Sequence, residues 1–156
     1  MSENPRTICW ETSCFIARFN EEHSRVDICK AIIEAAKRGE VTLYTSYLTM
    51  CEWAKIKGEY ATEADDTITK FLKNPYIHLV AIDLAVSRIT RNLVRDYRLD
   101  VRDAIHSATA IRKKVDVFHT YDNDDLIKLN GRIPEVDIII SEPTFDFQTE
   151  MPYQIR

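Results

Sequence analysis

Four acidic residues stand where their carboxylates could meet and do chemistry: Glu11, Glu52, Asp103 and Asp122. Three of them follow short apolar runs that we interpret as strands, and Asp103 lies near the start of a predicted helix. Ligands of an open parallel sheet bind beyond the carboxyl ends of its strands. Crowded carboxylates repel one another, and a divalent cation removes that conflict. Oxygen ligands suit hard ions, so the pattern predicts a Mg²⁺ or Mn²⁺ site for phosphodiester hydrolysis.

Each acid taken alone has a simpler explanation. An Asp at a helix start usually caps the helix, and an Asp after a strand usually belongs to a turn. The order and context of the whole set favour a shared site instead. Asp124 or Asp125 could supply a further acid, although a turn or a helix cap explains these two residues equally well.

Alternating strands and helices must position these acids. Five apolar runs predict strands: Thr7–Trp10, Val41–Tyr44, Ile77–Ile82, Val115–Phe118 and Val136–Ile140. Helical periodicity marks the segments between them: Glu22–Arg38, Leu48–Lys57, Thr62–Leu72, Asp83–Tyr97 and Asp100–Lys113. We expect Asp83 and Asp100 as N-caps and Gly39 as a C-cap. This alternation predicts an α/β fold with a mainly parallel five-stranded sheet flanked by helices.

Length and composition indicate one globular domain over residues 1–156, with a core from about 7 to 140 and a tail from 141 to 156. The formal net charge is −4, so the protein lacks the overall positive charge with which some proteins bind nucleic acid regardless of sequence. No apolar run approaches the length of a membrane span, and no signal peptide is recognisable. The four cysteines form no C-x-x-C pair, so we expect no zinc site and a cytoplasmic location with free thiols.

Other side chains have two interpretations each. Arg88, Arg91, Arg95 and Arg98 form a stripe on one helical face, with Arg102 beyond it; the stripe could grip phosphates or simply face solvent. Helix-terminal charge explains the cations that end the next helix, namely Arg112, Lys113 and Lys114. We expect the aromatic residues to be core or interface rather than base-stacking platforms: Trp10, Tyr47, Trp53 and Tyr97. For His106 we expect a surface or capping role.

Taken together, these segments resemble the PIN-domain family, most closely its VapC-type toxin ribonucleases. The family pattern is a strand ending in an acid with Thr-Ser or Thr-Asn, a helical Glu after a Ser/Thr-rich turn, an Asp-Ala with a small-residue helix, and a strand ending in Thr-x-Asp. Here these motifs read Ile8–Ala17 (ICWETSCFIA), Thr45–Glu52 (TSYLTMCE), Asp103–Ala110 (DAIHSATA) and Thr120–Asp122 (TYD). The resemblance implies a three-layer α/β sandwich.

The resemblance also implies roles for individual residues. Glu11, Glu52, Asp103 and Asp122 would ligate Mg²⁺ or Mn²⁺ directly or through water, and Ser13 and Thr120 would orient those carboxylates. One departure matters, because the family usually has Asp where this chain has Glu11. The additional methylene moves the carboxylate by about an ångström, which could weaken a site with strict octahedral geometry.

Three functions remain open at this point. The resemblance implies a metal-dependent endoribonuclease, the toxin of a toxin–antitoxin pair, forming a homodimer and held inactive by an antitoxin. The apolar faces of Glu22–Arg38 and Thr62–Leu72 are expected contact surfaces. Glu11 supports the alternative of an attenuated or inactive PIN-fold scaffold that binds RNA or protein. An unrelated phosphoryl-transfer enzyme is the third, but neither an Asp-x-Asp after the first strand nor a Walker loop supports it.

Overall fold

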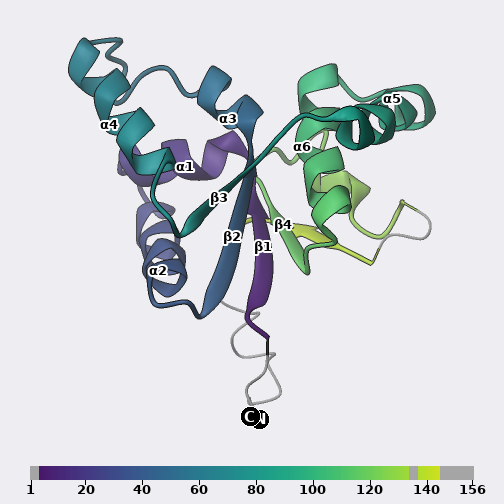
Figure 1. Cartoon of the computed structure of the whole chain (residues 1–156), viewed down its shortest axis with the longest axis horizontal. Helices are drawn as coiled ribbons and strands as arrows, with labels where there is room; N and C mark the ends of the chain where they lie inside the picture. Colours follow the sequence, from purple (N-terminus) through teal and green to yellow (C-terminus); the bar gives the residue numbers. More distant parts are fainter. Residues whose placement is uncertain (1–3, 134–136, 145–156) are drawn as a thin grey trace.

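The structure is built on a five-stranded parallel sheet with the order β3-β2-β1-β4-β5, in which every neighbouring pair runs in the same direction. The computed structural model describes residues 4–133 and 137–144 (Figure 1). The strands are β1 Arg6–Trp10, β2 Val41–Ser46, β3 Ile77–Val80, β4 Val117–His119 and β5 Ile139–Ser141. The expected α/β fold with a parallel five-stranded sheet is thus confirmed.

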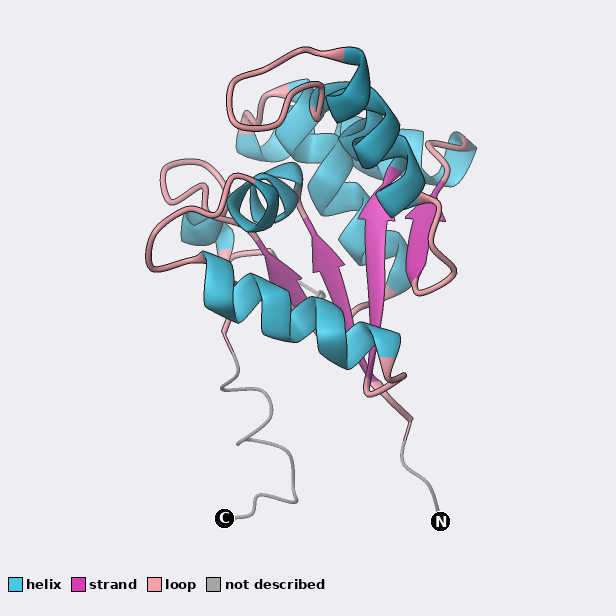
Figure 2. Cartoon of the chain, turned by 90° about the vertical axis from the view of Figure 1, so that its left-hand side faces the viewer, coloured by secondary structure: helices cyan, strands magenta, loops and turns pink. Residues whose placement is uncertain are grey.

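Helices cover both faces of the sheet, which makes three layers (Figures 1 and 2). They are α1 Thr12–Phe19, α2 Val26–Lys37, α3 Tyr47–Glu52, α4 Thr62–Leu72, α5 Leu84–Tyr97 and α6 Val101–Lys113, with a short 3₁₀ helix at Ile127–Leu129. Helices α1 and α2 pack on one face, whereas α6 packs on the other and α5 covers its outer side. No helix of the described residues is long and apolar enough to cross a membrane.

The alternation of side chains along the central strand divides the apolar core in two. Ile8 and Trp10 point into the cluster beneath α1 and α2, whereas Cys9 points into the cluster beneath α5 and α6. A strand buried on both faces must be apolar at every position, and β1 obeys this rule in its last three residues. Trp10 and Trp53 are fully or almost fully buried, as expected, but Tyr47 is 46% exposed.

Helix bounds follow the expectations where local signals are strong. Helix α4 has the predicted bounds, and the side chains of Asp83 and Asp100 cap α5 and α6 by accepting backbone N–H groups. Gly39 follows α2 with a positive φ of 76°, which is the conformation expected after a helix C-terminus. Helix α5 ends at Tyr97, because Arg98 adopts a left-handed conformation.

Other expectations were wrong at particular places. Helix α1 was not anticipated; it is short and begins without a side-chain cap. Helix α2 begins later than predicted, because Glu21 and Ser24 have positive φ values, which a right-handed helix does not allow. Helix α3 ends at Glu52, since Trp53 is extended and turns into the core. Val136, the predicted start of the last strand, and most of the tail (145–156) lie outside the described residues.

The apolar faces of α2 and α4, expected as contact surfaces, are mostly used in the protein's own core. Each face is buried in the protein's own core, with Cys29, Ile32 and Ile33 from α2 and Ile68 and Leu72 from α4.

The last residue of β4 is a buried histidine, His119, which lies beside Trp10 of the central strand. His119 is 0% exposed, and its Nδ1 accepts a hydrogen bond of 3.1 Å from the Trp10 indole N–H. Burial lowers the pKa of His119 to about 3, with a smaller contribution from the positive charge of Arg6. The imidazole is therefore neutral in the folded protein well above pH 3.

This depressed pKa makes a prediction for stability. The unfolded chain protonates His119 below about pH 6.5 while the folded chain does not, so stability falls as the pH drops from 6.5 towards 3, by up to about 1.4 kcal/mol per pH unit. Urea unfolding at pH 7, 6 and 5 measures the slope. His119→Gln keeps an acceptor for Trp10 but does not titrate, so the slope should be shallower in this variant. Parallel profiles for the two proteins would contradict the assignment.

Candidate metal site

The carboxylate of Glu11 is held in place at the end of β1. Glu11 immediately precedes α1, and its backbone N–H donates to the carbonyl of His119 across the sheet. The hydroxyl of Thr120 donates to Glu11 Oε1 at 2.8 Å, and that of Ser13 donates to the same oxygen at 2.5 Å. Both hydroxyls are in turn fixed by backbone N–H groups, of Asp122 and Tyr121 respectively. Ser13 and Thr120 thus lie where carboxylate-orienting groups were expected.

Glu52, the last residue of α3, projects towards the same end of the sheet. Its Oε1 accepts a hydrogen bond of 2.6 Å from the Thr12 hydroxyl, and His106 Nε2 lies 2.7 Å from the same oxygen. Burial opposes ionisation of Glu52, but the hydrogen bonds from His106 and Thr12 outweigh burial and lower the pKa. Glu52 is therefore a carboxylate at neutral pH.

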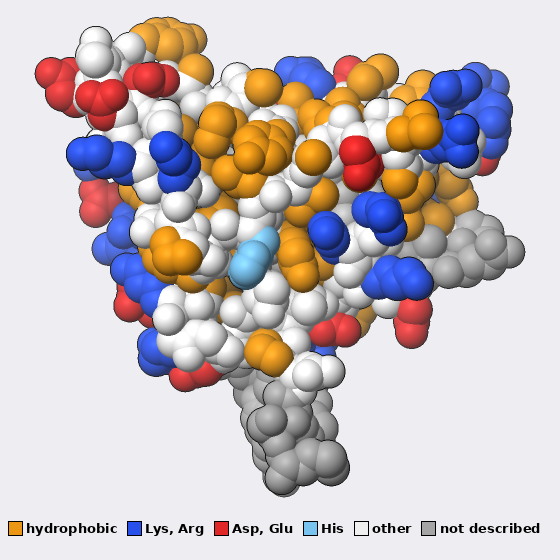
Figure 3. Space-filling model, viewed as in Figure 1, with side chains coloured by type: hydrophobic (Ala, Val, Ile, Leu, Met, Phe, Trp, Pro, Cys, Tyr) orange, Lys and Arg blue, Asp and Glu red, His pale blue; other side chains and the backbone are white. Residues whose placement is uncertain are grey.

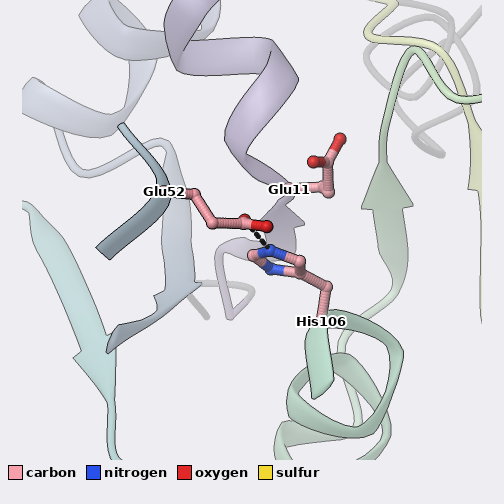
Figure 4. A group of neighbouring side chains, drawn as sticks. All are labelled: Glu11, Glu52 and His106. Carbon is pink, nitrogen blue, oxygen red and sulfur yellow. Dashed lines mark hydrogen bonds and ion pairs between the residues drawn. The ribbon is translucent and has the colours of Figure 1, made fainter. Parts of the chain in front are cut away.

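His106 corrects an expectation. We expected a surface or capping role, but this side chain is only 1% exposed and lies with Glu11 and Glu52 in a group whose ligand atoms are all within 4.8 Å of one another (Figure 4). The small residues of α6 explain the burial: Ala104, Ser107 and Ala108 are buried and bring the helix close to the sheet. The DAIHSATA segment contained this signal, since His106 is set among small residues that were expected to pack closely.

A second group contains the remaining acids. Oxygens of Asp103, Asp122 and Asp125 also lie within 4.8 Å of one another, and Asp103 joins the group from the first turn of α6. Asp125 therefore belongs to the cluster as well as to the turn, in which its backbone N–H and that of Asp124 donate to Asp122 Oδ1. The turn explanation is therefore confirmed for Asp124 and Asp125, and of these two only Asp125 also lies within reach of the other acids.

Burial and the charges of the neighbouring acids make Asp103 harder to ionise. Its pKa is raised to about 6, first by burial and then by the negative charges of Asp122, Asp100, Asp125 and Glu11. No hydrogen bond to the Asp103 carboxylate is found among the described residues. The charge of Glu11 acts on Asp103, so the two groups of ligand atoms share one electrostatic environment.

The donor set fits a hard divalent cation. Five carboxylates come from the ends of β1, α3 and β4 and from the start of α6, and their mutual repulsion would be relieved by positive charge. Mg²⁺ and Mn²⁺ match these carboxylate oxygens, and His106 is the one nitrogen donor in the two groups, fewer than the several His or Cys ligands of a typical zinc site. The four cysteines are free thiols, and three of them are buried.

The arginine stripe lies mainly on α5. Arg88, Arg91 and Arg95 are exposed on α5, which packs on α6 rather than on the sheet (Figure 3 shows basic side chains gathered at this side of the molecule). Arg95 is paired with Asp96 at 2.8 Å. Arg98 lies beyond the end of the helix, and Arg102 contacts Asp100.

Comparison with known proteins agrees with this architecture. The toxin–antitoxin complex from Klebsiella pneumoniae contains a similar chain, with a TM-score of 0.63 and 20% identity over 85% of this chain and 95% of that one. For VapBC2 from Rickettsia felis, bound to a DNA fragment from its promoter, the TM-score is 0.61 and the sequence identity 17%, over 87% of this chain and 98% of that one. For VapC20 of Mycobacterium tuberculosis, a sarcin-ricin loop cleaving toxin, the TM-score is 0.61 and the sequence identity 17%, over 75% of this chain and 91% of that one.

At these identities the structural likeness establishes the fold alone. Among curated protein sequences, none matches this chain significantly. The profile of the PIN domain, however, matches residues 8–131, which contain every acid of the cluster. The chain belongs to the PIN domain family.

Proposed function

We propose that this protein is a divalent-metal-dependent endoribonuclease, the toxin of a toxin–antitoxin pair. The observation that carries the proposal is the convergence of Glu11, Glu52, Asp103, Asp122 and Asp125 at one end of the sheet. A Mg²⁺ or Mn²⁺ ion at such a site supplies charge that stabilises a phosphodiester undergoing in-line displacement. Membership of the PIN family and the similarity to toxins, one of which cleaves the sarcin-ricin loop, support the same proposal.

Each acid has a role in this proposal. Glu11 and Glu52 present carboxylates already oriented by neighbouring donors, and Asp103 and Asp122 complete the ligand set. Thr120 and Ser13 hold Glu11 in position, so the longer side chain that replaces the usual Asp has its own supports. This observation favours an active site over the attenuated scaffold, which remains the alternative that the experiments below test.

Partners are the second part of the proposal. Tyr47 and Ile82 follow the neighbouring strands β2 and β3 at the same end, and both are exposed, as is Leu84. Exposed apolar side chains grouped in this way are typical of contact surfaces. We assign them to the proposed homodimer or to the antitoxin, in place of the faces of α2 and α4.

Cleavage of a mixed RNA pool in Mg²⁺ or Mn²⁺ tests the enzyme. The protein and Glu11→Asp should both cut, whereas Asp103→Asn should lose at least about 100-fold of the rate, because a ligand is removed where even loss of a supporting group typically costs 10- to 100-fold. Asp124→Asn is the matched control, since this carboxylate lies outside the cluster. Activity confined to Glu11→Asp would indicate an attenuated enzyme, and cleavage that survives a chelator would contradict the metal requirement.

The raised pKa of Asp103 predicts a stability effect that needs no RNA. A folded-state pKa of about 6 against 3.8 unfolded means that stability is lost as the pH rises through 3.8 to 6. In chelator at pH 7.5, Asp103→Asn should therefore be more stable than the parent by about 1–2 kcal/mol, after allowance for solvent screening.

Adding Mn²⁺ should reverse that order, since a ligand that binds only the folded state stabilises it. Denaturant unfolding with and without metal gives both numbers. Asp124→Asn should respond to Mn²⁺ like the parent. If Asp103→Asn were less stable than the parent in chelator, the like-charge explanation would be wrong.

The arginines of α5 are proposed RNA contacts. Replacing both Arg88 and Arg91 by Ala in the inactive Asp103→Asn background should weaken RNA binding and reduce the slope of log K against log salt by about 1.4, as expected for two lost phosphate contacts. Filter binding at several salt concentrations measures this slope. Lys30→Ala on α2, which covers the opposite face of the sheet, is the control. An unchanged slope would leave the stripe as a solvated face.

A further inference from the structure

A buried imidazole touches the proposed metal site without being one of its acids. His106 projects from the second turn of α6 towards α3 and α1, and its Nε2 lies 2.7 Å from Glu52 Oε1 and 3.3 Å from the Thr12 hydroxyl oxygen. In Figure 4 the ring lies beneath the Glu52 carboxylate, and Glu11 lies beside the pair with its carboxylate pointing upward. These contacts join residues that are 54 and 94 positions apart in sequence.

The neighbours of Nε2 show that this nitrogen donates a hydrogen bond. Thr12 has one hydroxyl proton, and the shortest contact of its oxygen, 2.6 Å, is to Glu52 Oε1. Both oxygens near Nε2 therefore present lone pairs to it. A bare nitrogen at 2.7 Å from a carboxylate oxygen would be repelled, so Nε2 must be protonated and must donate. Nδ1 is buried with no hydrogen-bond partner among the described residues, so the ring makes its hydrogen bonds through Nε2 alone.

Two donors thus converge on one carboxylate oxygen. Thr12 and His106 both hold Oε1 of Glu52, whereas no hydrogen bond to Oε2 is found among the described residues. A carboxylate held by one oxygen keeps the other in a fixed direction, and Oε2 is then the atom that is available for a cation. A hard ion with strict octahedral geometry gains most from a ligand that needs no reorientation.

We propose that His106 is a positioning residue that orients Glu52 for the cation by donating its Nε2–H to Oε1. The inference rests on the proposed metal nuclease and adds to it a residue outside the acidic set. His106 need not touch the ion or the RNA. Its contribution is to the geometry of Glu52, and it should therefore be measurable as metal affinity.

Three substitutions of His106 separate the donated hydrogen bond from packing. His106→Gln places an amide N–H near the position of Nε2, His106→Asn carries the same amide one methylene short of Glu52, and His106→Leu fills much of the ring's volume without a donor. Calorimetric titration with Mn²⁺, without RNA, gives the metal affinity of each. Thermal unfolding in chelator gives the stability of each and shows whether each one folds.

If His106 positions Glu52, His106→Leu and His106→Asn should each bind Mn²⁺ about 10- to 100-fold more weakly than the parent, and His106→Gln should stay within about 3-fold. The order of affinities should not follow the order of melting temperatures. Either unfolded variant can be dropped, because Leu and Asn each provide the comparison with Gln.

Other results would overturn the inference. Affinity retained by Leu and lost by Gln would mean that the ring only fills space, and equal affinity in all variants would mean that Glu52 needs no support. In both cases the parent still binds Mn²⁺, so the metal nuclease would survive. Failure of the parent to bind Mn²⁺ would instead contradict the proposed function and the inference together.

Discussion

Repulsion between carboxylates is the constraint on which this structure depends. Parallel strands deliver their carboxyl ends to one edge, and here the acids at that edge come within 4.8 Å of their neighbours in each group. Like charges at such distances oppose folding unless hydrogen bonds, protons or a cation offset them. The arrangement of the surrounding polar residues can be understood as the response to this one problem.

The response differs between the two groups of acids. Glu11 and Glu52 each accept two hydrogen bonds on a single oxygen, from Ser13 and Thr120 in one case and from Thr12 and His106 in the other. Asp103 has no comparable donor among the described residues, and the pKa of this carboxyl is raised while that of Glu52 is lowered. Protein donors therefore satisfy one part of the cluster, and the other part is left to bind a proton or a cation.

The sequence predicted the elements of the site and the residues that support Glu11, but not those that support Glu52. Strand and helix periodicity are local signals, so α4 was predicted with its observed bounds and the acids were predicted to follow their strands. His106 was misjudged because its partners, Thr12 and Glu52, come from distant elements, and nothing within a few residues marks the contact. Helix α1 was missed for a related reason, since its buried face is defined only by packing against α2 and β1. Non-local contacts of this kind become visible only in the folded chain.

Glu11 shows how such supports change the meaning of a substitution. Considered alone, a Glu in place of the usual Asp lengthens a ligand by a methylene and weakens a strict coordination geometry. In the folded protein, however, Ser13 lies on the first turn of α1 and Thr120 directly after β4, and their hydroxyls meet the extended carboxylate at Oε1. These hydroxyls themselves accept hydrogen bonds from backbone N–H groups, so their positions relative to Glu11 are fixed. The two donors therefore hold the longer carboxylate in one place, which supports the proposal that Glu11 can serve as a ligand despite its additional methylene.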